Sequence, residues 1–305
     1  MSKRPAPSSK PKRRRRKSAV KSTPDGGAPS PLPKSGAERK QIRSKSWDAV
    51  AGWYSGWSGP EGSRHHRERA MPTLIELLQP RKGERILDIG CGAGALCSAV
   101  SGCGADYVGV DLSEKLIALA RKHHRGRSFH VGDATRLPSV NALSKESFDG
   151  ATFLLSLQDI NPLGDAIDSA AWALKPGGRL VLLLIHPCFR IPRQSGWGVD
   201  EQRKLKFRRV DKYLSELDVP MQEYDGGRQG VTRSYHRPLE AYVNTLFAHG
   251  LVTEELRETP APPPKGTVQE PRIDRLARED IPLFLGLRAR KRQLRVPLRT
   301  GKNTR

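Results

Sequence analysis

The chain has 305 residues, a hydrophobic content of 36% and a formal net charge of +22. The charge is concentrated at the ends, because residues 1–45 carry 15 Lys or Arg against 2 acidic residues and residues 287–305 carry 8 against none. Residues 46–286 are nearly neutral, with 31 basic and 30 acidic residues. This distribution excludes a basic nucleic-acid-binding module over the whole length and confines any such role to the ends.

The two ends are predicted to be tails. Residues 1–45 are rich in Pro, Ser, Lys, Arg and Gly and cannot bury enough apolar surface to offset the entropy of ordering, so they are predicted to be disordered. The basic run at 12–17 is either a solvated stretch or a weak phosphate-binding segment, for RNA for instance. Residues 291–305 form a second basic tail, and the folded domain is expected at 46–290.

Several classes of protein are not expected. No apolar run approaches the roughly 20 residues that span a bilayer, so no membrane span is predicted. The first 30 residues lack the apolar core of a secretory signal. The four cysteines form no CxxC pair, which favours reduced thiols in a cytoplasmic protein. No metal site is predicted.

Residues 47–185 have the pattern of an α/β fold. An aromatic segment at 47–58 is followed by an amphipathic helix at 67–78 with Met71, Leu74, Ile75 and Leu78 on one face. Short apolar runs then alternate with helical stretches near 94–101, 113–124 and 165–174. This alternation predicts βαβ units and a parallel sheet. The runs are 85–89, 107–110, 128–131, 148–155 and 179–185.

The pattern changes after residue 185. Residues 186–236 are polar, basic and aromatic with little periodicity, and we expect them to be an inserted substrate lid. A helix at 238–249 ended by Gly250, a strand at 251–256, a Pro-rich loop at 259–272 and a last strand at 281–287 follow. The whole pattern predicts a Rossmann-like, doubly wound, mostly parallel seven-stranded sheet with an inserted lid.

A glycine-rich loop follows the first predicted strand. Gly90, Gly92 and Gly94 stand where the backbone must turn sharply and approach a ligand without a Cβ in the way. NAD-binding folds share this loop, so it is weak evidence alone. Asp111 ends the second strand and can accept both ribose hydroxyls of an adenosine. Asp133 ends the third strand, where it can read the adenine edge; this residue and the turn at 174–178 favour a methyl donor over NAD.

The ordered segments LDIGCGAG, GVDLS, GDATRLP, FDGATFLLSLQDI and LKPGGRLVLLL resemble class I S-adenosylmethionine-dependent methyltransferases. They are most similar to the broad group that includes the ubiquinone- and menaquinone-biosynthesis-type enzymes. The resemblance covers 47–185 strongly and 186–290 loosely. It implies a Rossmann-like fold, the cofactor S-adenosyl-L-methionine and a transferase activity, and it says little about the acceptor.

The resemblance also implies cofactor-binding roles at matching positions. These lie in the glycine loop, at the ends of the second, third and fourth strands and in the amino-terminal aromatic segment; they are Tyr54, Asp88, Gly90, Gly92, Asp111, Leu112, Asp133, Ala134 and Leu155. Asp88 would act through the loop or a water, Leu155 would flank the methyl-donor end together with Ser156, and Tyr54 would cover the cofactor. Simple packing is the alternative for Tyr54.

Methyl transfer from a sulfonium is an in-line displacement that positioning alone can accelerate, and a base is needed only if the acceptor loses a proton. Three residues at the carboxyl edge of the sheet are candidates. Gln158 stands where related enzymes often have His, and it cannot act as a base. Asp159 either orients an acceptor amine or caps the following helix. His186 is either a general base or a polar residue that closes its strand.

A small-molecule acceptor is the first hypothesis, with O, N or C as the accepting atom. The second is methylation of RNA or of a ribosome-associated protein, docked through the basic tails. A non-catalytic methyltransferase-like scaffold is the third, against which the intact glycine loop and both acidic positions argue. The oligomeric state is left open by the sequence.

Overall fold

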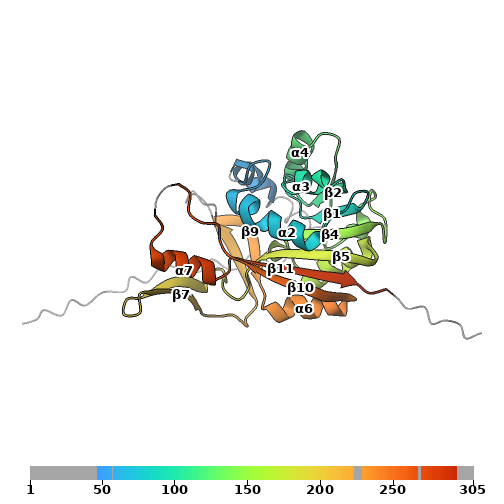
Figure 1. Cartoon of the computed structure of the whole chain (residues 1–305). Helices are drawn as coiled ribbons and strands as arrows, with labels where there is room; N and C mark the ends of the chain where they lie inside the picture. The colour runs from blue at the N-terminus through green and yellow to red at the C-terminus, as the bar shows by residue number, and fades with distance from the viewer. Residues whose placement is uncertain (1–46, 57, 223–228, 267–268, 294–305) are drawn as a thin grey trace, which may run out of the picture.

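The computed structural model describes residues 47–56, 58–222, 229–266 and 269–293. The predicted tail at 1–45, its basic run at 12–17 and most of the tail at 291–305 lie outside the described residues. Figure 1 shows a central twisted sheet with helices packed against it and a smaller β-rich part at one end, beside α7 (Arg272–Asp280).

The central sheet has seven strands, in the order β10-β11-β5-β4-β1-β2-β3. The five strands β1 to β5 run parallel to one another, whereas β11 runs antiparallel to both β5 and β10. The prediction of a mostly parallel, seven-stranded Rossmann-like sheet is therefore confirmed. The strands are β1 (Arg85–Ile89), β2 (Asp106–Asp111), β3 (Ser128–Val131), β4 (Phe148–Leu154), β5 (Leu174–Ile185), β10 (Leu251–Thr259) and β11 (Phe284–Lys291).

The helices divide between the two faces of the sheet. On one face α2 (Met71–Leu78), α3 (Cys97–Gly102) and α4 (Glu114–His123) pack with Tyr107 and Val181 in one buried cluster. On the other face α5 (Leu163–Ala173) and α6 (Leu239–Ala248) pack with Phe148 and Phe153 in a second cluster. Both faces of the sheet are thus covered, which explains the continuously apolar run of β5.

The insertion after β5 contains two antiparallel hairpins, formed by β6 (Ser195–Asp200) with β7 (Leu205–Val210) and by β8 (Leu217–Gln222) with β9 (Gln229–His236). The sequence gives little sign of these strands, because polar residues stand on both of their faces. The helix α7 lies between the predicted loop at 259–272 and the predicted strand at 281–287, in a stretch for which no element was predicted. It packs against β7, where Lys206 Nζ lies 2.5 Å from Asp274 Oδ1.

The last strand also differs from its prediction. It begins at Phe284 and continues to Lys291, beyond the predicted end at residue 287. The continuation was not predicted, because Arg288 and Arg290 interrupt the apolar run. In the structure both side chains pair with Glu254 on β10. In the described part of the chain no helix is long and apolar enough to cross a membrane.

Candidate active site

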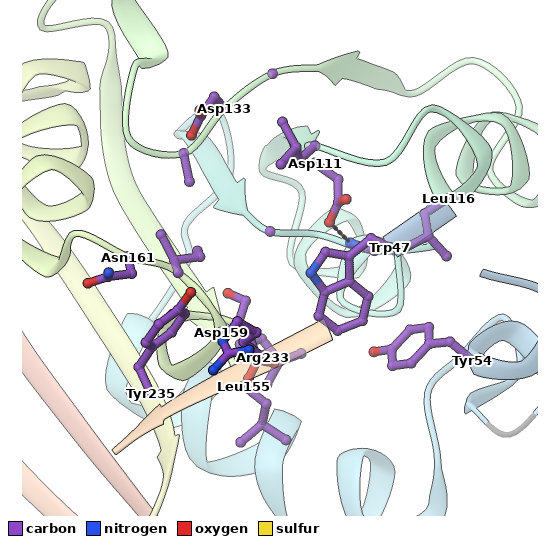
Figure 2. Close-up of a pocket in the computed structure, with 18 residues that line it drawn as sticks. Trp47, Tyr54, Asp111, Leu116, Asp133, Leu155, Asp159, Asn161, Arg233 and Tyr235 are labelled. Atoms are coloured by element: carbon purple, nitrogen blue, oxygen red, sulfur yellow. Dashed lines mark hydrogen bonds between the residues drawn. The ribbon is translucent and has the colours of Figure 1, made fainter. Parts of the chain in front are cut away.

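A cavity lies at the carboxyl edge of the parallel strands, between the loops that follow β1, β2, β3 and β4 (Figure 2). The helical segment at 47–56 and the strand β9 of the insertion also contribute to its wall. Nine of the twelve residues singled out from the sequence line this cavity: Tyr54, Gly90, Gly92, Asp111, Leu112, Asp133, Ala134, Leu155 and Asp159. The other three are Asp88, Gln158 and His186.

The loop after β1 is shaped by glycine. Gly90 and Gly92 have φ angles of 72° and 55°, in the left-handed region that L side chains rarely adopt. A Cβ at Gly90 would lie 2.6 Å from the Cβ of Ser156, so the loop after β4 approaches too closely for a side chain. The amides of Gly90 and Cys91 both donate to the carbonyl of Val110, at 2.8 and 3.0 Å, which docks the loop on β2.

Asp111 is held by backbone amides at the end of β2. Its Oδ2 accepts a 2.9 Å hydrogen bond from the Gly92 amide, and its Oδ1 accepts one of 2.9 Å from the Ser113 amide. Burial raises the pKa of the Asp111 carboxyl, against these backbone hydrogen bonds, which lower it. The carboxylate is therefore fixed in the cavity wall with lone pairs left for a ligand, beside Leu112.

Asp133 is positioned in the same way at the end of β3. Its Oδ1 accepts hydrogen bonds from the amide of Thr135 at 2.9 Å and from its hydroxyl at 2.7 Å. The neighbouring Gly132 must lack a side chain, because a Cβ there would lie 2.5 Å from Val140 Cγ2. Gly132, Asp133 and Ala134 together line the cavity.

Asp88 lies beneath the loop and does not line the cavity. Its carboxylate accepts hydrogen bonds from the hydroxyls of Tyr107 at 2.7 Å and Thr152 at 2.9 Å. The residue is 1% exposed, and burial raises its pKa to about 6, despite the two hydroxyl donors. The Asp88 carboxylate therefore links β1 to β2 and β4 just before the glycine loop, and any part that it has in cofactor binding would be indirect.

Two aromatic residues of the helical segment at 47–56 face the cavity (Figure 2). The rings of Trp47 and Tyr54 meet edge to face, with centroids 6.0 Å apart. Asp48 docks the segment on the start of α4, where its Oδ1 accepts hydrogen bonds from Ser113 Oγ at 2.5 Å and the Lys115 amide at 3.2 Å. Burial raises the pKa of Tyr54 to about 12, so its hydroxyl stays protonated.

The loop after β4 forms the other end of the cavity. Leu155 has a φ of 53°, and Ser156 Oγ donates a 2.8 Å hydrogen bond to the carbonyl of Ile89. Asp159 is largely buried, and its Oδ1 has no hydrogen-bond partner among the described residues. Burial raises its pKa to about 7, whereas a hydrogen bond from Ser234 and the charge of Arg237 act in the opposite direction. Its carboxyl therefore exchanges a proton near neutral pH.

Gln158 and His186, two of the three candidates for catalysis, lie outside the cavity wall. Gln158 Nε2 donates a 2.6 Å hydrogen bond to the carbonyl of Leu155. His186 is 1% exposed; its Nε2 lies 2.7 Å from Glu258 Oε1, and its Nδ1 accepts a 3.2 Å hydrogen bond from the Cys188 amide. Both ring nitrogens are engaged, so His186 closes its strand and the structure does not bring it to Asp159.

The cavity wall includes residues that the sequence did not single out. Arg233 and Tyr235 reach it from β9, and Trp47, Ile160 and Asn161 from nearer segments. Arg233 and Tyr235 are two residues apart and therefore share one face of a strand. This spacing is the sequence signal that could have identified them as lining residues, but it applies only once β9 is known to be a strand. Among the described residues no group of His, Cys, Asp or Glu could hold a metal ion.

The strand order, the antiparallel β11, the glycine loop and the two strand-end carboxylates define a class I methyltransferase fold. The family described as methyltransferase domain matches residues 63–221, more than half of the chain, and the chain belongs to this family. The resemblance recognised in the sequence motifs is thereby confirmed.

Individual relatives of the chain are also methyltransferases. The chain is 31% identical over 153 residues to a ubiquinone biosynthesis O-methyltransferase of Xylella fastidiosa, a match that covers 48% of this chain and 61% of that protein. It is 32% identical over 108 residues to a demethylmenaquinone methyltransferase of Beutenbergia cavernae, covering 35% of this chain and 43% of that protein. The chain thus spans less than two thirds of the length of these relatives.

Solved structures extend the likeness over more of the chain. An S-adenosylmethionine-dependent methyltransferase from Mesorhizobium loti superposes with a TM-score of 0.57 at 28% identity. That match covers 72% of this chain and 96% of the other.

Proposed function

We propose that this protein is an S-adenosylmethionine-dependent methyltransferase whose acceptor is a small molecule. The observation that carries the proposal is the cavity in which the glycine loop, Asp111 and Asp133 meet the loop after β4. These groups come from four strands, and all lie at the carboxyl edge of the sheet, where ligands of such folds bind.

The residues of the cavity fit this cofactor. The absence of a side chain at Gly90 lets Ser156 approach the loop, and the backbone of Gly90 and Gly92 lines the cavity where a ligand would lie along the loop. The Asp111 carboxylate keeps acceptor capacity for two ribose hydroxyls, and Leu112 offers an apolar contact beside it. Asp133 and Ala134 would meet the adenine edge, and Tyr54 would cover the cofactor. S-adenosylmethionine supplies a methyl group on a positively charged sulfur, which is a good leaving group.

A small acceptor is supported by the way the cavity is closed. Trp47 and Tyr54 contribute to one side and Arg233 and Tyr235 to another, so the insertion at 186–236 would act as the acceptor lid. The names of the curated relatives, which concern ubiquinone and demethylmenaquinone, point in the same direction. We prefer a small-molecule acceptor to RNA, because the cavity lining and the names of the relatives both support it. The RNA hypothesis is supported only by the basic composition of the two ends of the chain.

We assign the handling of the acceptor proton to Asp159. It alone among Gln158, Asp159 and His186 lines the cavity. A carboxyl with a pKa near neutrality is suited to receive a proton at physiological pH, and positioning by the cavity wall supplies the rest of the acceleration. A cytoplasmic location belongs to the same proposal, supported by four free thiols at Cys91, Cys97, Cys103 and Cys188.

The test has two parts. Calorimetry with S-adenosylhomocysteine measures the cofactor site directly, and we expect binding that is lost in Gly90→Ala. Transfer of labelled methyl from S-adenosylmethionine to a cell extract, separated into small-molecule, RNA and protein fractions, then identifies the class of acceptor. Label in the small-molecule fraction is expected. Label confined to RNA or protein would contradict the acceptor class, and absence of cofactor binding would contradict the activity.

A further inference from the structure

A buried arginine holds the loop at the acceptor end of the cavity. Arg237 follows β9 directly and is 4% exposed. Its Nη2 donates hydrogen bonds to the carbonyl of Ile160 at 2.8 Å and to Asn161 Oδ1 at 3.1 Å, and its Nη1 donates to the carbonyl of Leu157 at 3.4 Å. These acceptors enclose Asp159 in the sequence, so one guanidinium fixes the turn η3 (Leu157–Asp159) from both sides.

The hydrogen bonds that the Arg237 guanidinium donates to the turn go to neutral oxygens and provide no ion pair for its charge. Within the described part of the chain, none of its hydrogen bonds goes to a carboxylate. A buried charge without an ion pair is costly, and neutral carbonyl acceptors offset only part of that cost. The charge of Arg237 acts on Asp159, because it lowers the pKa of the Asp159 carboxyl.

We propose that Arg237 is a positioning residue of the methyl transfer, which fixes the turn that carries Asp159 and keeps this carboxyl able to lose its proton inside the protein. The inference rests on the proposed function and deepens it. It assigns a part in acceptor chemistry to the residue that directly follows the insertion, in addition to the lining by Arg233 and Tyr235.

Arg233 also lines the cavity, but its guanidinium pairs with Asp218, so Arg237 is the cation that lowers the pKa of Asp159. Tyr54 from the helical segment and Tyr242 from α6 both have raised pKa values, chiefly through burial, and stay neutral. Ser234 on β9 contributes a neutral hydrogen bond to the carboxyl. The ring of Tyr235 lies 5.4 Å from the Arg237 guanidinium carbon and offers it a cation–π contact, with no charge of its own.

In the reaction, a lone pair of the acceptor oxygen or nitrogen forms the new bond to the methyl carbon. The bond between that carbon and the sulfur breaks, and its electron pair stays on the sulfur. The proton of the acceptor O–H or N–H passes to the Asp159 carboxylate. Asp159 must therefore start ionised, and in a buried site this requires a favourable charge such as that of Arg237.

The experiment measures the ionisation of Asp159 without cofactor or acceptor. The full-length protein is labelled with aspartate carrying ¹³C at the carboxyl, the Asp159 signal is assigned with Asp159→Asn, and its pKa is followed by NMR from acid to alkaline pH. Loss of a nearby opposite charge raises a carboxyl pKa by about 1 unit or more. We expect such a rise in Arg237→Met and Arg237→Gln and an almost unchanged pKa in Arg237→Lys. The matched control is Arg209→Met, whose side chain is 66% exposed.

The four variants separate charge from hydrogen bonding. Arg237→Gln keeps a donor for the turn and loses the charge, whereas Arg237→Lys keeps the charge. A rise in Arg237→Lys as large as in Arg237→Met, or a rise in Arg237→Met no larger than in the control, would overturn the inference. If Arg237→Met does not fold, the Gln and Lys variants decide in the same way. Calorimetry with S-adenosylhomocysteine on the same samples tests the proposed function separately, because the titration needs no ligand.

Discussion

The two ends of the cavity are built in different ways. At the cofactor end, Asp111 and Asp133 are held by amides and hydroxyls within a few residues or at the neighbouring loop, such as Ser113, Gly92 and Thr135. At the acceptor end, the turn that carries Asp159 is held by Arg237, which is about 80 residues further along the chain. The first end is encoded by short motifs, and the second depends on long-range contacts made by Arg237, directly after the insertion.

This difference explains why only one end of the cavity can be recognised from the sequence. Short motifs that fix their own backbone can be recognised in a sequence, so the cofactor end identifies the fold and the family. The acceptor end is assembled from side chains on a different hairpin, and its composition can vary without changing the sheet. Substitutions at the two ends should therefore affect different measurements, and four experiments test this.

Gly90→Ala is expected to have the largest effect. A Cβ there meets Ser156 at 2.6 Å, and the φ of 72° strains any L residue, so we expect loss of measurable S-adenosylhomocysteine binding and a lower melting temperature. Gly59→Ala is the matched control, since Gly59 has a φ of 68° and open space around it. The control should cost only the backbone strain of about 1–2 kcal/mol. Equal effects of both variants would show that the close approach to Ser156 is unimportant.

Asp111→Asn should weaken cofactor binding next most strongly. The variant replaces a carboxylate oxygen by an amide NH2 donor, which opposes the Gly92 and Ser113 amides, and it removes the charge-assisted contact proposed for the ribose. We expect binding weaker by a factor of about ten or more, as loss of such a hydrogen bond implies. Asp106→Asn on the same strand, with a side chain 56% exposed, serves as the control. Unchanged calorimetric affinity in Asp111→Asn would refute the assignment of the cofactor end.

Trp47→Ala tests the cover of the cavity. The indole contacts Tyr54 edge to face, and its loss should remove packing against the ligand worth about 1 kcal/mol, or a roughly fivefold weaker affinity. Trp197→Ala, in the hairpin of β6 and β7, is the matched control and should leave affinity unchanged. A loss of the same size in both variants would indicate a general effect on stability.

The smallest effect is expected on the pH dependence of stability. Burial raises the pKa of Asp159 from 3.8 to about 7, so the folded protein keeps a proton that the unfolded chain releases between these pH values. The unfolding free energy must therefore fall as the pH rises through this window. Asp159→Asn removes this contribution, and its melting temperature should decline less between pH 4 and pH 7 than that of the wild type. Parallel curves would mean that Asp159 titrates normally.

Much of the fold could be predicted from the pattern of apolar and polar residues in the sequence. The apolar runs predicted β1 and β3 to the residue, and the glycine loop together with Asp111 and Asp133 predicted one wall of the cavity. The hairpins of the insertion were missed, because their strands carry polar residues on both faces, even where these are buried, and so lack the alternation of apolar and polar residues that marks a half-buried strand. For the same reason Arg233 and Tyr235 were not recognised as lining residues.

The sequence by itself determined the sheet, the family and the cavity wall formed by the glycine loop, Asp111 and Asp133, because glycines with positive φ and carboxylates held by adjacent amides act over a few residues. Only the tertiary structure decided which catalytic candidate reaches the cavity. His186 and Asp159 both follow strands at the same edge of the sheet. The His186 ring is paired with Glu258, however, whereas Asp159 lines the cavity. That choice depends on contacts between segments distant in sequence, such as the hydrogen bond from Arg237 to the carbonyl of Ile160 beside Asp159.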